Sequence, residues 1–337
     1  MSFHDDALPG SDEPENDLSD APLPRMEGFG VVQAPVKVAC VQAEPVVLDR
    51  DATLDKLAAL TAEAAGEGAR LVVFPETFVS VYPSSTWASA LAGWANPDAK
   101  AAFAQLVRSA VEVPGPAADR LGEIAREHGV WLVTGVNETD PSRNGTVYNA
   151  LLYHAPDGSL ALKHRKLVPT NHERLIWGQG DGGGLRAFET PIGRLGGLIC
   201  WENYMPLARF ALYESGIEIY IASTADDAEE WQSTLVHIAR ESRSFVVAPC
   251  HLQRASAYRA DFPLKELIEG MGLLSHGGSA ILAPDGSYLA GPLYDEEGIL
   301  YAELDPARLL EERQRFDAAG HYNRPDILRL TVTPLGE

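Results

Sequence analysis

The stretch GGLICWENY, residues 196–204, raises the question on which fold and function both depend. Small and apolar residues lead into Cys200, as in a buried strand, and polar residues follow it at once, as at a turn. A free cysteine is most often a buried residue that packs as a small hydrophobe. The alternative is a nucleophile at a strand-to-helix turn, which requires a base and an electrostatic partner from elsewhere in the chain.

Segments typical of strands and helices alternate on both sides of this stretch. Short apolar or β-branched runs, as in buried strands, occupy residues 36–45, 71–77, 130–138, 216–224 and 244–252. Apolar residues at helical spacing occupy residues 49–70, 117–130, 206–215 and 229–243. Two further strand pairs turn at Asp157-Gly158 and Asp285-Gly286, a dipeptide typical of hairpins. The alternation predicts an α/β fold with mixed strand directions.

The composition indicates a large globular body and excludes several classes of function. The chain has 337 residues, of which 45% are hydrophobic, so it can bury a large core without disulfides or metals. No run approaches the roughly 18 apolar residues that a membrane span needs, and the beginning of the chain has no apolar signal segment. A net charge of −21 repels nucleic acid and anionic membranes. The three widely spaced cysteines are typical of a reducing compartment, so we expect a cytoplasmic protein.

The first part of the chain differs from the rest in charge. Residues 1–27 contain eight acidic residues against one arginine, a net charge of −7. Four prolines and few large apolar residues share this stretch, so it cannot bury a core of its own. We therefore predict a disordered acidic leader over residues 1–35. No linker divides the remaining chain, which predicts one folded domain over residues 36–330.

No pattern in the sequence indicates a metal or cofactor site. The nine histidines form no H-E-x-x-H pair, and Cys250-His251 lacks the further ligands of a zinc site. Gly178, Gly180 and Gly183 match G-x-G-x-x-G, but no strand precedes them and no helix follows, which is typical of a tight loop. We therefore expect neither a metal nor a cofactor.

Three polar residues stand where predicted strands end. Glu76 follows an apolar strand and a proline in FPET, and Lys166 precedes a proline-restricted run in HRKLVPT, with Glu173 seven residues later. Cys200 ends a third strand. Each residue alone is explained as simply by a loop, a solvated strand end or a core position. Because sites in α/β sheets gather beyond the carboxyl ends of strands, we hypothesise that the three converge in one pocket.

In this order, FPET, HRKLVPT and CWEN resemble the motifs of the nitrilase (carbon–nitrogen hydrolase) superfamily. The likeness extends from about Val36 to HYNRPDILRL near the end of the chain. The segments PTNHERLIWGQGDG and CWENYMPLARF resemble the true nitrilase branch more than the amidase or carbamoylase branches. The resemblance implies a four-layer α-β-β-α sandwich that pairs into an αββααββα homodimer, and often into larger spiral homo-oligomers.

The resemblance also implies roles for individual residues. Glu76, Lys166 and Cys200 match the catalytic residues, and Glu173 matches a second, structural glutamate. The substrate is then a small nitrile. By position, four residues resemble those that line the nitrile pocket: Tyr82, His172, Trp177 and Trp201. Aromatic walls of this kind fit an aryl nitrile or an arylacetonitrile, and also an aliphatic nitrile.

The charges of these residues predict how the nucleophile is activated. Two glutamates and one lysine beside a neutral thiol sum to −1, whereas a resting thiolate would bring the sum to −2, which is costly in a desolvated pocket. We therefore predict that Cys200 rests as a thiol and that Glu76 removes its proton as general base. Attack on the nitrile gives a thioimidate and then a thioester, and Lys166, together with the Trp201 N–H, stabilises the tetrahedral intermediates.

Two alternative functions stay open at this point. The first is an amidase or a cyanide dihydratase of the same superfamily, which uses the same nucleophile. The second is a catalytically inactive binding or scaffold protein, a class in which we expect one of Glu76, Lys166 or Cys200 to be lost. All three are present.

Overall fold

The computed structural model describes residues 34–143 and 145–334, so the predicted leader lies outside it except for its last two residues. The strands form two mixed sheets. The first sheet has seven strands in the order β13-β1-β2-β4-β5-β6, with β3 paired to β4. Its strands are β1 (Val36–Gln42), β2 (Leu71–Val73), β3 (Val111–Glu112), β4 (Trp131–Thr139), β5 (Val147–His154), β6 (Leu160–Arg165) and β13 (Gly298–Leu304).

The second sheet has six strands in the order β10-β11-β9-β8-β7, with β12 paired to β11. Its strands are β7 (Leu195–Ile199), β8 (Ile219–Ser223), β9 (Phe245–Ala248), β10 (Leu252–Arg254), β11 (Leu273–Leu282) and β12 (Tyr288–Tyr294). Four strands of the first sheet run parallel, β1, β2, β3 and β4, and three strands of the second, β7, β8 and β9. The predicted hairpins are the antiparallel pairs β5–β6 and β11–β12.

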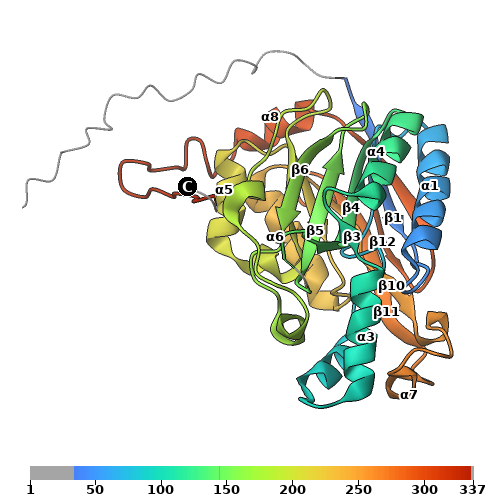
Figure 1. The fold of residues 1–337 in the computed structure, drawn as a ribbon. Helices are drawn as coiled ribbons and strands as arrows, with labels where there is room; N and C mark the ends of the chain where they lie inside the picture. The colour runs from blue at the N-terminus through green and yellow to red at the C-terminus, as the bar shows by residue number, and fades with distance from the viewer. Residues whose placement is uncertain (1–33, 144, 335–337) are drawn as a thin grey trace, which may run out of the picture. The chain divides into compact units, whose positions relative to one another are not determined.

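Two helices cover the outer face of each sheet, so the chain forms four layers, helix, sheet, sheet and helix (Figure 1). Leu57 of α1 and Leu121 of α4 pack against the first sheet, and Leu212 of α5 and Leu235 of α6 pack against the second. Their bounds are α1 (Arg50–Gly66), α4 (Pro116–His128), α5 (Pro206–Glu214) and α6 (Glu229–Ser242). The remaining helices are α2 (Ser85–Ala88), α3 (Pro97–Arg108), α7 (Lys265–Ile268) and α8 (Ala307–Arg313).

The core between the two sheets is apolar and is built from both of them. Val73 and Val133 of the first sheet belong to the same buried cluster as Ile199, Ile221 and Val247 of the second. Burial on both faces explains why these strands are continuous apolar runs in the sequence. The polar residues that follow these strands are therefore the ones that indicate where a functional site lies.

Local sequence signals account for the helix ends that border these layers. The Asp49 side chain accepts a hydrogen bond from the N–H of Ala52 and caps α1. Helix α4 begins at Pro116, and Gly129, whose φ is +64°, caps its C-terminal end. Among residues 34–143 and 145–334, no helix combines the length and the apolar character that crossing a membrane requires.

The structure corrects the sequence interpretation at two predicted strands. The single strand predicted for 244–252 is two strands, β9 and β10, because Pro249 lacks the N–H that would continue the pairing. The strand predicted for 71–77 ends at Val73, before Pro75. Both prolines leave irregular backbone beside the end of the sheet, and in the second case that backbone carries Glu76.

Gly135 permits a close crossing of β4 by the segment that carries Glu76. A Cβ added at Gly135 would meet the Pro75 carbonyl oxygen and would lie 2.6 Å from the Thr77 nitrogen. These are backbone atoms, which cannot rotate away as the end of a side chain can.

We expect Gly135→Ala to lower the free energy of unfolding by about 1–3 kcal/mol, because the crossing segment must move. Thermal unfolding measures the change. Gly66→Ala is the matched control, since an added Cβ at Gly66 meets nothing within 4 Å. Equal unfolding midpoints for the two variants would contradict the prediction.

Candidate active site

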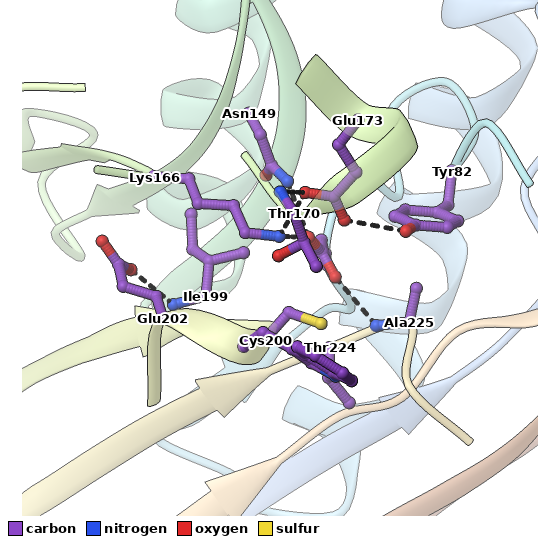
Figure 2. Close-up of polar contacts among 12 residues, drawn as sticks. Tyr82, Asn149, Lys166, Thr170, Glu173, Ile199, Cys200, Glu202, Thr224 and Ala225 are labelled. Atoms are coloured by element: carbon purple, nitrogen blue, oxygen red, sulfur yellow. Dashed lines mark hydrogen bonds and ion pairs between the residues drawn. The ribbon is translucent and has the colours of Figure 1, made fainter. Parts of the chain in front are cut away.

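Three strand ends from two different sheets meet at one buried cluster of polar side chains. Glu76 follows β2, Lys166 follows β6 and Cys200 follows β7. All three are almost inaccessible to water, with exposed fractions of 0%, 1% and 4%. The structure therefore brings together the three residues that the sequence analysis placed at separate strand ends, as Figure 2 shows for Lys166 and Cys200.

The ammonium of Lys166 lies between two carboxylates. Its Nζ is 2.9 Å from Oε1 of Glu76 and 2.7 Å from Oε2 of Glu173. Burial alone would lower the pKa of Lys166, but the neighbouring negative groups outweigh it and raise the pKa above its ordinary value. Lys166 is therefore a fixed positive charge at neutral pH.

Backbone contacts on each side hold Lys166 in place. Its N–H donates to the carbonyl of Asn149 at 2.8 Å, and its carbonyl accepts from the N–H of Gly180 at 2.8 Å. A Cβ at Gly180 would meet the carbonyl of Arg165, so this glycine allows the loop to approach the end of β6. The G-x-G-x-x-G match in the sequence is thus part of a tight loop, as predicted.

Glu76 accepts hydrogen bonds on both carboxylate oxygens. Asn149 donates from Nδ2 to Oε1 at 2.6 Å, and the N–H of Ala225 donates to Oε2 at 2.8 Å. Burial raises the pKa of Glu76 and the charge of Glu173 raises it further, against the opposite effect of Lys166. A carboxylate with a raised pKa is a better general base near neutral pH than an exposed glutamate.

Glu173 lies on the short 3-10 helix η2 (Asn171–Leu175) and is held from three directions. Besides Lys166, the Tyr82 hydroxyl donates to Oε1 at 2.8 Å and the N–H of Thr170 donates to Oε2 at 2.6 Å (Figure 2). The carboxylate caps η2 and pairs with the lysine at the same time. This arrangement gives the ammonium of Lys166 a second fixed partner besides Glu76.

Cys200 stands at a sharp turn between β7 and the 3-10 helix η4 (Cys200–Tyr204). Its φ is +52°, the left-handed region that residues other than glycine rarely adopt. The Asn203 side chain donates to the Cys200 carbonyl at 2.9 Å and holds the turn. Cys200 therefore packs in the core between the sheets and also lies beside the charged groups that a nucleophile at this turn would require.

The environment of Cys200 disfavours its thiolate. Burial raises the pKa of the thiol and Glu76 raises it further, whereas Lys166 and a hydrogen bond with the Thr224 hydroxyl act in the opposite direction. The direction agrees with the charge count made from the sequence. Cys200 is a protonated thiol at neutral pH.

Three of the four predicted pocket residues gather around Glu173. The Tyr82 ring lies 5.8 Å from the Trp177 ring and 6.3 Å from the His172 ring, measured between centroids. Burial lowers the pKa of His172, so its imidazole is neutral. Trp201 lies elsewhere, with 51% of its surface exposed and its indole N–H donating to Asp226 at 2.7 Å.

The sequence analysis did not single out Asn149, Ala225, Thr224 or Glu202. The sequence does mark Asn149 as unusual, because its polar side chain interrupts the apolar strand VYNALLY. The other three take part through contacts between chain segments far apart in sequence. In the part of the chain that the structure describes, no three His, Cys, Asp or Glu side chains are grouped as metal ligands would be.

Comparisons with known proteins agree on one family. The carbon-nitrogen hydrolase family model matches residues 37–314. The chain is 43% identical over 306 residues to nitrilase 2 of Arabidopsis thaliana, covering 88% of each chain. It is 44% identical over 305 residues to an aliphatic nitrilase of Sinorhizobium fredii, covering 88% of this chain and 95% of that one. The structure of a carbon-nitrogen hydrolase from Helicobacter pylori shares the fold, with a TM-score of 0.68 at 22% identity, covering 88% of this chain and 97% of that one.

We expect no thiolate from Cys200 between about pH 6 and pH 9, a range that includes the ordinary thiol pKa of about 8.5. A raised pKa keeps the proton on sulfur throughout this range and moves ionisation to more alkaline pH. The measurement is the ultraviolet thiolate absorbance of the wild type minus that of Cys200→Ser. Cys40 and Cys250 are present in both proteins and cancel. A difference signal already complete at pH 7 would contradict the assignment.

Proposed function

We propose that this chain, which belongs to the carbon–nitrogen hydrolase family and to its nitrilase branch, hydrolyses an organic nitrile to the carboxylic acid and ammonia. One observation carries the mechanism: the protonated thiol of Cys200 lies beside a buried cluster that contains both a base, Glu76, and a fixed cation, Lys166. The cluster supplies what a thiol needs in order to attack a weak electrophile.

The first steps form a covalent intermediate. Glu76 takes the proton of Cys200 as the sulfur attacks the nitrile carbon, and the proton then passes to the nitrile nitrogen, which gives a thioimidate. Moving the proton from sulfur to Glu76 keeps the total charge of the four groups at −1. No step therefore requires a second uncompensated negative charge in the buried site.

Two molecules of water complete the reaction. The first adds to the thioimidate carbon, Glu76 delivers a proton to nitrogen, and ammonia leaves, so that a thioester remains. The second water hydrolyses the thioester, releases the carboxylic acid and returns the proton to the sulfur of Cys200. Lys166 stabilises the tetrahedral intermediates, because its ammonium is held in place and does not reorganise as charge develops.

Glu173 acts on the reaction through Lys166. Its carboxylate lies 2.7 Å from the ammonium and takes a hydrogen bond from Tyr82 on its other oxygen. The aromatic rings of Tyr82 and Trp177 and the neutral His172 form a wall next to this carboxylate. We assign the non-reacting part of the nitrile to this wall, which suits a neutral apolar substituent, aryl or aliphatic. Trp201 contributes through its backbone N–H, which directly follows Cys200 and stabilises the tetrahedral intermediates together with Lys166.

Copies of this chain are proposed to pair through the helical layer of the second sheet. Large apolar or aromatic side chains are exposed there at the start of α5 and just before it: Trp201, Tyr204 and Leu207, with exposed fractions of 51%, 45% and 67%. Exposed apolar patches of this kind mark contact surfaces between proteins. An αββααββα homodimer would cover this surface and keep the two outer helices of the first sheet facing water.

Ammonia release from matched substrates separates the nitrilase from an amidase of the same family. We expect ammonia from a nitrile such as phenylacetonitrile, benzonitrile or an aliphatic dinitrile, and much less from the corresponding amide. The thioimidate forms only from a nitrile, whereas an amide must lose its nitrogen in a different first step. Ammonia from the amide alone would assign the protein to the amidases, and ammonia from cyanide alone would make it a cyanide dihydratase.

Substitution of the nucleophile tests the covalent mechanism. Cys200→Ala should abolish nitrile turnover, with a loss of more than about 10³-fold, because the sulfur that forms the thioimidate is removed. The folded state should persist, since the change removes one sulfur atom from the core. Cys40→Ala is the control, because Cys40 packs in the core between the sheets as an apolar residue.

Turnover is measured as ammonia release, and folding as the thermal unfolding midpoint. Retention of a tenth of the wild-type rate by Cys200→Ala would rule out a covalent intermediate on this residue. An equal loss of rate in Cys40→Ala would show that disruption of the core, and not loss of the nucleophile, accounts for the effect.

A further inference from the structure

The carboxylate of Glu202 connects the two sheets at the two strand ends that matter for the reaction. Its Oε1 accepts from the N–H of Leu167 at 2.8 Å, and its Oε2 accepts from the N–H of Ile199 at 2.9 Å. Leu167 directly follows Lys166 in the chain, and Ile199 directly precedes Cys200. Figure 2 shows Glu202 beside Ile199, next to the side chains of Lys166 and Cys200.

This carboxylate is buried and charged. The side chains of Glu202 and His164 are both fully buried, and Nε2 of His164 is 2.9 Å from Oε2 of Glu202. Burial alone would raise the pKa of Glu202, but His164 and the two backbone N–H groups outweigh it and lower the pKa. An ionised carboxylate can accept all three of these hydrogen bonds.

We infer that Glu202 is a positioning residue for the proposed reaction: by binding the N–H groups on both sides of the site, it sets the distance between the sulfur of Cys200 and the ammonium of Lys166. This inference rests on the function proposed above for Cys200. Glu202 does not contact the substrate in this assignment, because its side chain has no exposed surface and both of its oxygens accept hydrogen bonds from the protein.

The strained backbone at Cys200 explains why such a residue is needed. A non-glycine residue at φ +52° is strained, so it persists only where its surroundings hold it. Glu202 holds the N–H before Cys200, and Asn203 holds the carbonyl of Cys200 itself. Only the Glu202 contact extends to the other sheet. Without it, the turn and Lys166 would be aligned less directly, by the packing of the two sheets and by the hydrogen bond from the N–H of Ala225 to Glu76.

Glu202→Gln tests the inference with little change in size. The amide keeps one oxygen acceptor but places an NH₂ group against one of the two backbone N–H donors, which breaks the connection at one end. We expect kcat per reactive site to fall by about 10- to 100-fold while KM changes by less than about 3-fold, because misplacement of about 1 Å costs rates of this order. The number of reactive sites is counted by mass spectrometry as Cys200 alkylated by iodoacetamide.

The same alkylation gives a readout that needs no nitrile. Its rate at Cys200 should fall by about 5-fold or more in Glu202→Gln, because sulfur must lose its proton to the same neighbours in order to attack. If the wild type hydrolyses no nitrile, the proposed function fails, and the alkylation rate still decides the role of Glu202.

Glu312→Gln is the matched control, since Glu312 pairs with Arg243 at 2.9 Å, a partly buried ion pair that involves α8. It should lower the unfolding midpoint and leave kcat per reactive site and the alkylation rate unchanged. If Glu202→Gln behaves like Glu312→Gln in these two quantities, or raises KM at constant kcat, the inference is overturned.

His164→Asn decides the question if Glu202→Gln does not fold. It keeps an N–H donor near Glu202 but removes the imidazole, so the carboxylate is held less firmly while its two backbone hydrogen bonds remain. We expect kcat per reactive site to fall by about 3- to 10-fold at constant KM, because asparagine replaces only part of the hydrogen bond to the charged carboxylate. An unchanged kcat would overturn the inference.

Discussion

The ammonium of Lys166 is buried where water does not reach it, and the site is organised around keeping that charge. An unpaired ammonium in a protein interior costs several kcal/mol, so it requires close partners. Glu76 and Glu173 supply them at 2.9 and 2.7 Å. Two carboxylates around one cation leave a net charge of −1, and this excess adds to the effect of burial in keeping the proton on Cys200.

The partners come from different layers, so the packing of the two sheets is itself part of the site. Glu76 and Lys166 follow strands of the first sheet, Cys200 follows a strand of the second, and the Ala225 N–H on Glu76 comes from the second sheet's side. Gly135 lets the segment that carries Glu76 lie close against β4, and Gly180 lets its loop approach the end of β6 beside Lys166. Apolar packing between the sheets brings these groups near one another, and hydrogen bonds to charged groups then fix their spacing.

The sequence predicted the parts of this arrangement that depend on local pattern. Apolar runs predicted the parallel strands except the short β3, Asp-Gly pairs predicted both hairpins, and the order of Glu76, Lys166 and Cys200 indicated the family. The sequence did not predict that β13 pairs with β1, because β1 lies near the beginning of the described chain and β13 near its end. It also missed Asn149 and Glu202, since nothing local shows which backbone N–H or carboxylate a buried polar side chain will reach.

A thiol that stays protonated until the substrate binds has consequences for selectivity. Oxidants react with thiolates that are accessible, and Cys200 at rest is neither ionised nor exposed. A nitrile held against the sulfur makes loss of the thiol proton less costly. The negative charge then develops on the substrate nitrogen, where a proton and the nearby ammonium can compensate it. In the proposed mechanism Glu76 holds the thiol proton during the attack, and its raised pKa suits it to take the proton from sulfur and pass it to the nitrile nitrogen. The same net charge of −1 that suppresses the free thiolate therefore favours reaction with a substrate that can accept the proton.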